Sequence, residues 1–377
     1  MTGPLRQIPS AENHHTVKEW LNQHAFEGGC LNNRYLELPF AESETIMAPK
    51  TIDTQLHWCF QTAGPHYPLP PFAAVIEDGR LFGRRGIIMT SDHKLLKDVS
   101  VQRSSETPDI LPRVSYTGGT TAVLTFKFIK NYFHWMLDVL PRILLLRELR
   151  LPIDKYVISP QSSYPYLESM HMLGVPKEKI VVSTRKLHLQ AQKLIVTSRV
   201  SYKEFYPKWS CDFVRNELLA AAEASVQDGT PKTRIYISRE GASKRKVTNE
   251  AAVMKRLAPY GFHTVRLETM SLKEQIHLFR SADVILAPHG AALTNLIFAR
   301  PGTKVIELFS PDYVKKYYWV ISSHYQLDYY YLIGAGARHT DPLYPNNRFE
   351  SITVNLNDLD RLLELAELHR ANKEGAG

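Results

Sequence analysis

Short apolar runs alternate with amphipathic stretches from about residue 233 to residue 333. Each run is β-branched or apolar and is bounded by turn signals, which predicts strands. These runs are TRIYIS, FHTVRL, DVILA, KVIEL and DYYYLI. The stretches between them carry helical spacing over residues 249–260, 271–281, 291–299 and 313–325. Ser271 and Glu274 also fit a capping box. This alternation predicts a mostly parallel sheet with helices on both faces.

The first half of the chain repeats this pattern less regularly after about residue 120. Strands are predicted at residues 122–126, 155–159 and 179–182, and helices at residues 131–150 and 164–173. Asp78-Gly79 separates two apolar segments, which predicts a two-residue hairpin turn. Residues 1 to about 70 show no clear period. We therefore expect an irregular leader followed by a β-rich cap on the first sheet.

The chain has 377 residues, which is long for one core and favours two domains. A short polar segment with Gly and Pro, residues 225–231, is the best candidate linker. The hydrophobic fraction of 44% and charged fraction of 22% are typical of soluble proteins. No long apolar run predicts a membrane span, and the N-terminus lacks the apolar core of a signal peptide. We expect a cytoplasmic protein.

The cysteines and the net charge limit the kinds of site and partner that the chain can have. Cys30, Cys59 and Cys211 are few and far apart, which indicates buried or incidental thiols rather than a disulfide framework or a metal site. The net charge of +8 indicates either acidic partners, such as phosphorylated substrates or anionic lipid headgroups, or simply a solvated basic surface. Neither an RNP motif nor zinc-finger spacing is present, so no nucleic-acid partner is expected.

The first candidate cluster is the segment NYFHWMLDVLPR at residues 131–142. His134 and Asp138 are four residues apart, so on a helix they share one face and the carboxylate can orient the imidazole. Such a pair suits general-base catalysis, and the alternative is a helix-surface ion pair. Pro141 is expected to end or kink the helix and to leave Asp138 at an exposed helix end.

The second cluster follows the predicted strand TRIYIS. Arg239 and Arg245 flank the carboxyl end of this strand, where two guanidinium groups can bind a diphosphate through forked hydrogen bonds. Ser238 ends the strand, and Asn249 and Glu250 are expected to brace the loop. The run Lys244-Arg245-Lys246 also fits a solvated loop.

The third cluster lies at the end of the run DVILA. Pro288 ends the strand, and Gly290 allows another group to approach the backbone. The helix that starts at Ala291 presents amides without intrahelical partners, which favours an anion. The further candidates of this cluster are His289, Thr294, Asn295 and Glu307. His289 fits either a ligand contact or a structural hydrogen bond, and Glu307 fits either a ribose contact or a pairing role.

These clusters together resemble glycosyltransferase family 61, including its bacterial capsular and surface polysaccharide members. The resemblance rests on NYFHWMLDVLPRI at 131–143, on the spacing of Ser238, Arg239, Arg245, Asn249 and Glu250, and on HGAALTNLIF with PGTKVIEL at 289–308. It covers residues 120–310. The combination is specific, although each piece alone is not.

The resemblance implies a GT-B-like fold, with two Rossmann-like doubly wound domains facing a cleft. The expected division is an acceptor-side domain at residues 1–228, a nucleotide-sugar domain at residues 229–356, and a C-terminal helix within residues 357–377 that packs back on the first domain. It also implies an inverting transfer from a nucleotide-sugar, with UDP as the favoured nucleotide, to a glycan acceptor.

In that interpretation the arginines and the turn at His289 hold the donor. Asp138 is the first choice for the base, and His134 orients it or substitutes for it. No cofactor and no divalent metal are expected, because arginines and helix-terminal amides can stabilise the leaving diphosphate. The chain's one Asp-x-Asp, at Asp358 and Asp360, is predicted to open an amphipathic helix rather than bind manganese.

Three alternatives remain open at this point. A dinucleotide-dependent oxidoreductase would need a Gly-x-Gly-x-x-Gly turn, which is missing. A non-catalytic nucleotide-sugar or glycan binder on the same fold would be favoured by a buried Asp138. A basic protein could also dock by charge alone. Peripheral association with the inner membrane, or with a lipid-linked acceptor, fits the charge and the family setting. The sequence leaves the sugar, the acceptor and the oligomeric state open.

Overall fold

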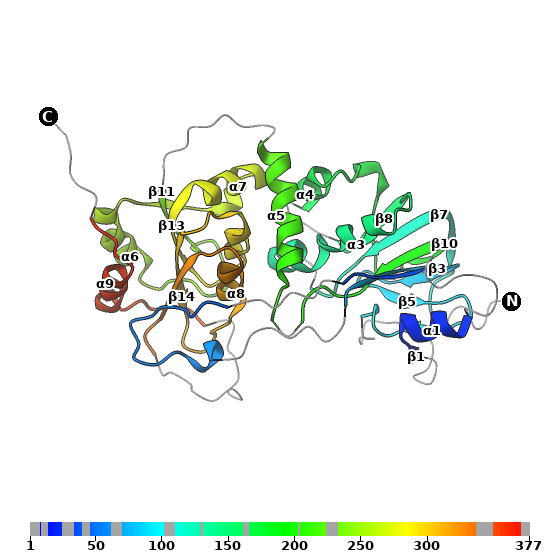
Figure 1. Ribbon diagram of the computed structural model, residues 1–377, viewed down its shortest axis with the longest axis horizontal. Helices are drawn as coiled ribbons and strands as arrows, with labels where there is room; N and C mark the ends of the chain where they lie inside the picture. Colours follow the sequence, from blue (N-terminus) through cyan, green and yellow to red (C-terminus); the bar gives the residue numbers. More distant parts are fainter. Residues whose placement is uncertain are drawn as a thin grey trace. The chain divides into compact units, whose positions relative to one another are not determined.

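The chain folds into two compact units (Figure 1). The computed structural model describes residue 8 and residues 14–24, 34–39, 46–61, 70–101, 110–128, 131–160, 166–202, 204–223, 233–336 and 350–370. Unit 1 comprises Met1–Glu42 and Tyr67–Tyr202, and unit 2 comprises Ser43–His66 and Lys203–Gly377. The expected α/β architecture with parallel sheets is confirmed, whereas the GT-B arrangement stays a prediction.

Unit 2 contains a sheet that is parallel throughout. Its strands, within the described residues, are β11 (Thr233–Ile237), β12 (Phe262–Val265), β13 (Ala282–Pro288), β14 (Lys304–Phe309) and β15 (Asp328–Ile333). They lie in the order β12-β11-β13-β14-β15. All five predicted strands are therefore present. This order is that of a doubly wound fold, in which the connections that leave the two strands at the switch point, β11 and β13, lie on opposite faces of the sheet.

Helices cover both faces of this sheet (Figure 1). On one face lie α6 (Glu250–Leu257) and α9 (Leu356–Leu365), and on the other lie α7 (Leu272–Ser281) and α8 (Tyr317–His324). Short 3₁₀ helices are η8 (Ala258–Tyr260), η9 (Leu267–Thr269) and η10 (Ala291–Phe298). The predicted capping box of α7 is confirmed, because Ser271 Oγ accepts from Glu274 N–H at 3.1 Å and the Glu274 carboxylate accepts from Ser271 N–H at 2.6 Å.

The C-terminal helix belongs to unit 2 and does not join the core of unit 1. Leu359, Leu362 and Leu363 of α9 are fully buried against Leu286 of β13 and Ile306 of β14. The expectation that this helix packs back on the first domain is therefore wrong. Its apolar stripe is buried in the core of unit 2, since the even-numbered side chains of the strands face it.

The boundary between the units also differs from the expected one after residue 228. Helix α5 (Lys208–Glu223) contacts α7, α8 and η10 and thus groups with unit 2. Residues 46–61, which include η5 (Trp58–Phe60), also belong to unit 2. Lys50 extends the sheet beside β15, because its N–H donates to Tyr329 O and its carbonyl accepts from Tyr331 N–H. The functional roles predicted for the two domains stay predictions.

Unit 1 contains a mixed sheet, which the structure describes with ten strands. They are β1 (His14–His15), β2 (Tyr35–Glu37), β3 (Phe72–Glu77), β4 (Arg80–Phe82), β5 (Ile87–Met89), β6 (Leu95–Leu96), β7 (Ser115–Leu124), β8 (Lys155–Ile158), β9 (Ile180–Val182) and β10 (His188–Thr197). Strands β10, β7, β8 and β9 pair in parallel, whereas β2 to β5 join through antiparallel pairs. The early strands therefore extend the sheet itself and do not form a separate cap.

The predicted hairpin at Asp78-Gly79 is wrong. Strands β3 and β4 both run antiparallel to β10, so the chain continues along the same neighbour after the two residues. Asp78 has a left-handed φ of 51° and its N–H donates to Gln192 O, while Gly79 O accepts from Ala191 N–H. A Cβ on Gly79 would lie 2.8 Å from Leu194 Cβ. The Asp-Gly pair therefore kinks the chain between β3 and β4, which both continue along β10.

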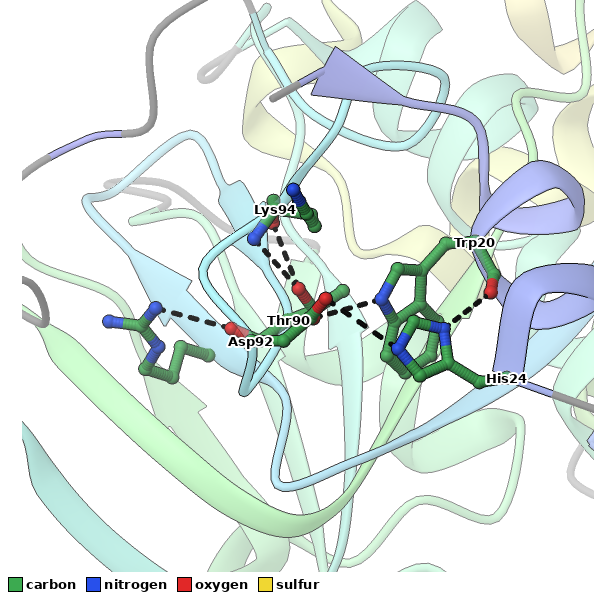
Figure 2. A network of polar contacts seen from close by, with 6 residues as sticks. Trp20, His24, Thr90, Asp92 and Lys94 are labelled. Atoms are coloured by element: carbon green, nitrogen blue, oxygen red, sulfur yellow. Dashed lines mark hydrogen bonds and ion pairs between the residues drawn. The ribbon is translucent and has the colours of Figure 1, made fainter. Parts of the chain in front are cut away.

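Helices pack on this sheet from both faces. Helix α1 (Val17–His24) packs its buried Val17, Trp20 and Leu21 in the core that β3 and β10 share. On the other side lie α2 (Tyr132–His134), the π-helical turn η6 (Trp135–Val139), α3 (Arg142–Glu148) and α4 (Tyr166–Met172), with η7 (Lys177–Lys179) before β9. Trp20 Nε1 donates to Asp92 Oδ1 at 2.9 Å, and His24 Nε2 lies 3.6 Å from Asp92 Oδ2 (Figure 2). These contacts tie α1 to the turn between β5 and β6.

Cys59 and Cys211 are buried free thiols, and Cys30 lies outside the described residues. Burial raises the pKa of the Cys59 thiol to about 12. Across the described ranges, no helix combines the length and the apolar character needed to cross a membrane.

Candidate functional site

The second and third candidate clusters meet at one edge of the unit 2 sheet. Ser238 and Arg239 directly follow β11, and His289 and Gly290 directly follow β13. These two strands are neighbours, and the connections that leave them lie on opposite faces of the sheet. The carboxyl ends of such a pair form the crevice in which doubly wound proteins bind ligands. The sequence therefore placed both clusters at the correct end of the sheet.

Gly290 is required by the close approach of Arg239. A Cβ at this position would overlap Arg239 Nη1 and would lie 2.7 Å from its Cζ. The Arg239 guanidinium donates from Nη2 to Lys244 O at 3.1 Å, while its Nε is buried and has no hydrogen-bond partner among the described residues. Burial and the nearby Arg245 lower the pKa of Arg239. A buried, unsatisfied guanidinium N–H is costly unless a ligand accepts from it.

Arg245 is fixed at the same turn. Its Nε donates to His289 O at 2.9 Å, and its guanidinium carbon lies 4.9 Å from the centroid of the Tyr313 ring. The residue adopts a left-handed φ of 51°, which is uncommon for a side chain of this size. The side chain is thus turned back from its loop toward the His289 turn. Two cations are therefore brought to one turn, as the sequence predicted.

His289 is buried and takes part in a short hydrogen-bonded chain. Its Nδ1 lies 2.5 Å from Glu307 Oε1, and Tyr329 donates its hydroxyl proton to Glu307 Oε2 at 2.5 Å. The His289 N–H donates to Leu308 O at 2.8 Å, and its ring stacks on Phe309 at 5.2 Å. Since both oxygens of Glu307 are engaged and the residue is fully buried, the pairing role fits it and the ribose role does not.

Burial sets the protonation of this pair. Desolvation raises the pKa of the Glu307 carboxyl well above its usual value. Desolvation, together with the charges of Arg245 and Arg239, lowers the pKa of His289 well below its usual value. Both shifts favour the neutral forms, a protonated carboxyl that donates to a neutral imidazole. The groups that hold the turn, His289 and Glu307, are thus neutral, and the positive charge at the turn comes from Arg239 and Arg245.

Three further residues of these clusters brace the loop that carries Arg245. Asn249 exchanges two hydrogen bonds with Val354, from Nδ2 to the carbonyl at 2.8 Å and from Val354 N–H to Oδ1 at 3.0 Å. Glu250 accepts from Tyr236 Oη at 2.8 Å and from Ser238 Oγ at 3.2 Å. The loop is therefore fixed at both ends, as expected for Asn249 and Glu250.

The start of η10 is the part of the third cluster that can meet a ligand. Ala291 is half-buried, whereas Thr294 and Asn295 are fully buried. Thr294 donates from Oγ1 to Ala291 O at 2.6 Å, and Asn295 donates from Nδ2 to Gln275 Oε1 at 2.8 Å. Their side chains therefore hold η10 in place, and the first amides of η10 are the groups that can bind an anion.

The first cluster lies in unit 1 and forms a hydrogen-bonded dyad. His134 Nδ1 lies 2.7 Å from Asp138 Oδ2, and Ser201 donates from Oγ to Asp138 Oδ1 at 2.5 Å. A carboxylate that accepts from Nδ1–H leaves the Nε2 lone pair of the imidazole available as a base. The His134 side chain is 20% exposed, and that of Asp138 is 2% exposed.

The backbone explains why Asp138 is buried. Pro141 does not end the helix at Asp138, because a π-helical turn spans Trp135–Val139 and Pro141 then caps α3. Leu140 N–H donates to Trp135 O at 3.0 Å, which is the five-residue bond of a π-turn. The expectation of an exposed helix end at Asp138 is therefore wrong. π-turns of this kind are frequent at functional sites.

Several side chains at these sites carry no motif and were missed. Phe128 stacks on the His134 ring at 4.4 Å and is 48% exposed, and Ser201 binds Asp138 from beyond the end of β10. Tyr313, Tyr317 and Tyr318 surround the His289 ring. The Tyr-rich run after residue 312 was the one available signal. Within the described residues, no three His, Cys, Asp or Glu side chains gather as metal ligands.

The sheet of unit 2, with two arginines beside its switch point, has the strand order of a doubly wound α/β fold. The sequence model of the family "Glycosyltransferase 61" matches residues 132–306, a range that contains every candidate catalytic or donor-binding residue except Glu307. The resemblance to this family is thus confirmed over that region.

Two plant proteins align with a shorter part of the chain. The rice (Oryza sativa subsp. japonica) protein named Beta-1,2-xylosyltransferase RCN11 is 40% identical over 74 residues, which are 19% of this chain and 14% of that protein. The Arabidopsis thaliana Beta-1,2-xylosyltransferase is 32% identical over 72 residues, again 19% of this chain and 14% of the relative. The chain thus aligns with about a seventh of each relative's length. The aligned region is thus similar in sequence to a part of these two enzymes.

Proposed function

We propose that this chain is an inverting glycosyltransferase that moves a sugar from a nucleotide-sugar to a hydroxyl of a glycan acceptor. The family match and the xylosyltransferase relatives support this class of reaction. The observation that carries the proposal is the crevice of unit 2. There the buried Arg239 Nε has no hydrogen-bond partner within the part of the chain that the structure describes, and Gly290 leaves room for the guanidinium.

The donor's diphosphate is assigned to Arg239, Arg245 and the first amides of η10. Two guanidinium groups and unpaired amides match the oxygens of a diphosphate in number and in charge. They also stabilise the negative charge that develops on the leaving group, so the reaction needs no divalent metal in this proposal. UDP is the favoured nucleotide, and the names of the relatives make a pentose the first sugar to test.

The proton step is assigned to the dyad. The acceptor hydroxyl attacks the anomeric carbon and forms the new C–O bond, while the bond from that carbon to the diphosphate oxygen breaks and its electron pair leaves with the nucleoside diphosphate. His134 Nε2 takes the hydroxyl proton, and Asp138 orients the ring and stabilises the imidazolium. This assignment exchanges the two roles expected from the sequence, because Asp138 is buried whereas His134 is partly exposed.

The remaining parts of the proposal rest on the family resemblance. They are a GT-B arrangement of the two units, a role in bacterial surface or capsular polysaccharide synthesis, and a cytoplasmic location with peripheral association at the inner membrane. The displacement mechanism requires the acceptor at the dyad to meet the donor's anomeric carbon. Inversion follows from the single displacement.

A second function is favoured by one observation. The 2% exposure of Asp138 fits a nucleotide-sugar or glycan binder that has kept the fold without catalysis. The two functions differ in turnover and agree in donor binding. A transfer assay therefore separates them.

The test combines calorimetry with a product screen. Wild-type protein is titrated with UDP, GDP, CDP and ADP, and then incubated with UDP-sugars and a panel of glycan acceptors while mass spectrometry follows the products. Saturable binding of one nucleotide and a product heavier by one sugar support the enzyme. Binding without a product across the panel supports the binder, and no binding of any nucleotide overturns both. Activity that is lost with EDTA and restored by a divalent cation would contradict the metal-independent mechanism.

A further inference from the structure

Unit 1 contains a pocket beside the dyad whose lining is strongly basic. Four cationic side chains line it, Arg85, Lys127, Arg142 and Arg199, and the one carboxylate in its lining is Asp138. The strand ends of β7 and β10 supply much of the remaining wall. This excess of cations is local to the pocket, and the proposed base does not need it.

The cations at the mouth of the pocket are not neutralised by the protein. Arg85, Lys127 and Arg199 are exposed, and none of them forms an ion pair within the residues that the structure describes. The carboxylate of Asp138 is bound by His134 and Ser201. Both oxygens of Asp138 therefore hold the dyad in place, and among the described residues neither oxygen binds Arg85, Lys127 or Arg199.

Arg142 forms the fixed part of the pocket. It is 7% exposed and donates from Nε to Thr197 Oγ1 at 2.6 Å, from Nη1 to Thr125 O at 3.0 Å and from Nη2 to Val123 O at 2.6 Å. All three acceptors are neutral. The charge of Asp138 also acts on Arg142 and offsets part of its positive field, and the remaining field acts on any anion that enters the pocket.

The pocket and the proposed base share side chains. Asp138 belongs to both, and Phe126, which lines the pocket, has its ring 5.7 Å from the ring of His134. A group bound in the pocket is therefore a neighbour of the hydroxyl that His134 would deprotonate. The donor diphosphate has its own arginines in unit 2, so it does not account for this second set of cations.

We propose that this pocket binds an anionic group of the acceptor, a carboxylate or a phosphate, so that the enzyme acts on acidic glycans. The inference rests on the proposed function, because it takes the dyad as the place where the acceptor hydroxyl reacts. Guanidinium and ammonium groups bind carboxylate and phosphate oxygens through charge-assisted hydrogen bonds. Lys127 Nζ lies 4.6 Å from the centroid of the Phe128 ring, and a neutral sugar would leave all three cations without a counter-ion among the described residues.

The experiment measures the binding of three small probes to the full chain by saturation-transfer NMR at low salt. The probes are glucose, glucuronate and glucose 6-phosphate, which differ in charge and share a ring. The test variant carries Arg85→Gln, Lys127→Gln and Arg199→Gln. The matched control carries Arg113→Gln, Lys186→Gln and Lys193→Gln, which removes the same charge from exposed positions of unit 1 outside the pocket.

We expect at least one acidic probe to bind on the order of tenfold more tightly than glucose, and the test variant to lose this preference while the control keeps it. A preference for glucuronate indicates a uronic acid in the acceptor, and a preference for glucose 6-phosphate indicates a phosphate. Equal binding of all three probes, an unchanged preference in the test variant, or an equal loss in the control would each overturn the inference.

UDP binding and an Arg245→Gln variant separate this inference from the proposed function. The acidic probe has to bind equally well to Arg245→Gln, since that residue belongs to the donor crevice in unit 2. UDP has to bind equally well to the triple pocket variant, and thermal melts confirm that the variant is folded. A protein that binds the acidic probe through the pocket but binds no nucleotide contradicts the donor assignment and leaves the pocket standing. If the protein transfers sugar equally to neutral and acidic acceptors, the proposed function is supported and the assignment of the pocket to an anionic group is contradicted.

Discussion

The two candidate regions differ in whether the groups that support the functional side chains are neutral or charged. The turn at His289 in unit 2 is held by neutral, buried groups and presents two cations, Arg239 and Arg245, of which Arg239 has a buried Nε without a hydrogen-bond partner among the described residues. The dyad in unit 1 is the reverse, because a buried carboxylate is committed to one partly exposed imidazole. Rigid support without charge suits a group that binds a fixed diphosphate. A charged support suits a group that must gain and release a proton.

The sharpest test of this comparison is the base itself. His134→Gln keeps a polar side chain of similar size but cannot accept the acceptor's proton, so kcat should fall by about 10²- to 10⁴-fold. The affinity for UDP, measured by calorimetry, should stay unchanged because the donor groups lie in unit 2. His171→Gln, at an exposed histidine of α4, is the control and should keep full activity. Full activity of His134→Gln would show that the base lies elsewhere.

A second test concerns the cations under the turn. Arg239→Ala should weaken UDP binding by about 10- to 100-fold, which corresponds to roughly 1.5–3 kcal/mol for a hydrogen bond to a charged group. Gly290→Ala should weaken it similarly, because its Cβ displaces the Arg239 guanidinium. The double variant should lose little more than either single one, since both changes remove the same contact. Gly118→Ala, where a Cβ meets open space, is the control, and fully additive losses would contradict this explanation.

A third test asks whether the support of the turn is neutral. The raised pKa of Glu307 means that the folded chain keeps a proton which the unfolded chain releases above about 4.5, so stability falls as pH rises toward the folded value. The lowered pKa of His289 acts the other way, because it costs stability only as pH falls below about 6.5. Above about pH 7 the Glu307 contribution therefore acts without the opposing one of His289.

Glu307→Gln removes that contribution while it keeps the shape of a protonated carboxyl. The unfolding free energy of the wild type, relative to this variant, should fall as the pH rises above 7, by at most about 1.4 kcal/mol per pH unit, until the pH reaches the raised pKa of Glu307. Urea unfolding at several pH values measures the difference. Parallel curves for the two proteins would mean that Glu307 is ionised in the folded state and that the turn is held by an ion pair.

The smallest expected effect concerns the aromatic cover of the dyad. Phe128→Ala removes the ring that stacks on His134, and an aromatic pair of this kind contributes about 0.5–1.5 kcal/mol. We expect kcat/KM for the acceptor to fall roughly two- to tenfold, with UDP affinity unchanged. Tyr116→Ala, which removes another exposed ring of unit 1, is the control. A larger fall in UDP affinity than in kcat/KM would contradict the assignment of this region to the acceptor.

The sequence predicted unit 2 well because a parallel sheet buries both faces of its strands. The runs at β13, β14 and β15 are continuously apolar and are separated by helical spacing, so both elements are visible without a partner. Unit 1 was predicted less well, because β10 pairs with β7 on one edge and with both β3 and β4 on the other. No local pattern encodes that arrangement, and the same Asp-Gly signal fits either a hairpin or a kink between two strands that follow the same neighbour.

The candidate site also contains residues that the sequence predicted and interactions that it did not. Arg239, Arg245 and Gly290 were found because glycines and basic residues at strand ends have a direct chemical meaning. The pairing of His289 with Glu307 and Tyr329 was not found, since it depends on the register between β14 and β15, which sequence spacing does not fix. The burial of Asp138 depended on a π-turn, and a proline one turn later gave the opposite signal.

The short strand-like contact of Lys50 with β15 has a consequence for the order in which the protein is made. Lys50 leaves the ribosome about 280 residues before its partner Tyr331, which at about 5–20 residues per second is on the order of 15 to 60 s. During that time residues 46–61 have no sheet to join, although the chain on both sides of them can already fold as unit 1. When β15 arrives, this early segment covers its open edge, the kind of edge along which chains aggregate. A fragment that starts at residue 203 would lack residues 46–61, so the edge of β15 that Lys50 contacts would stay open.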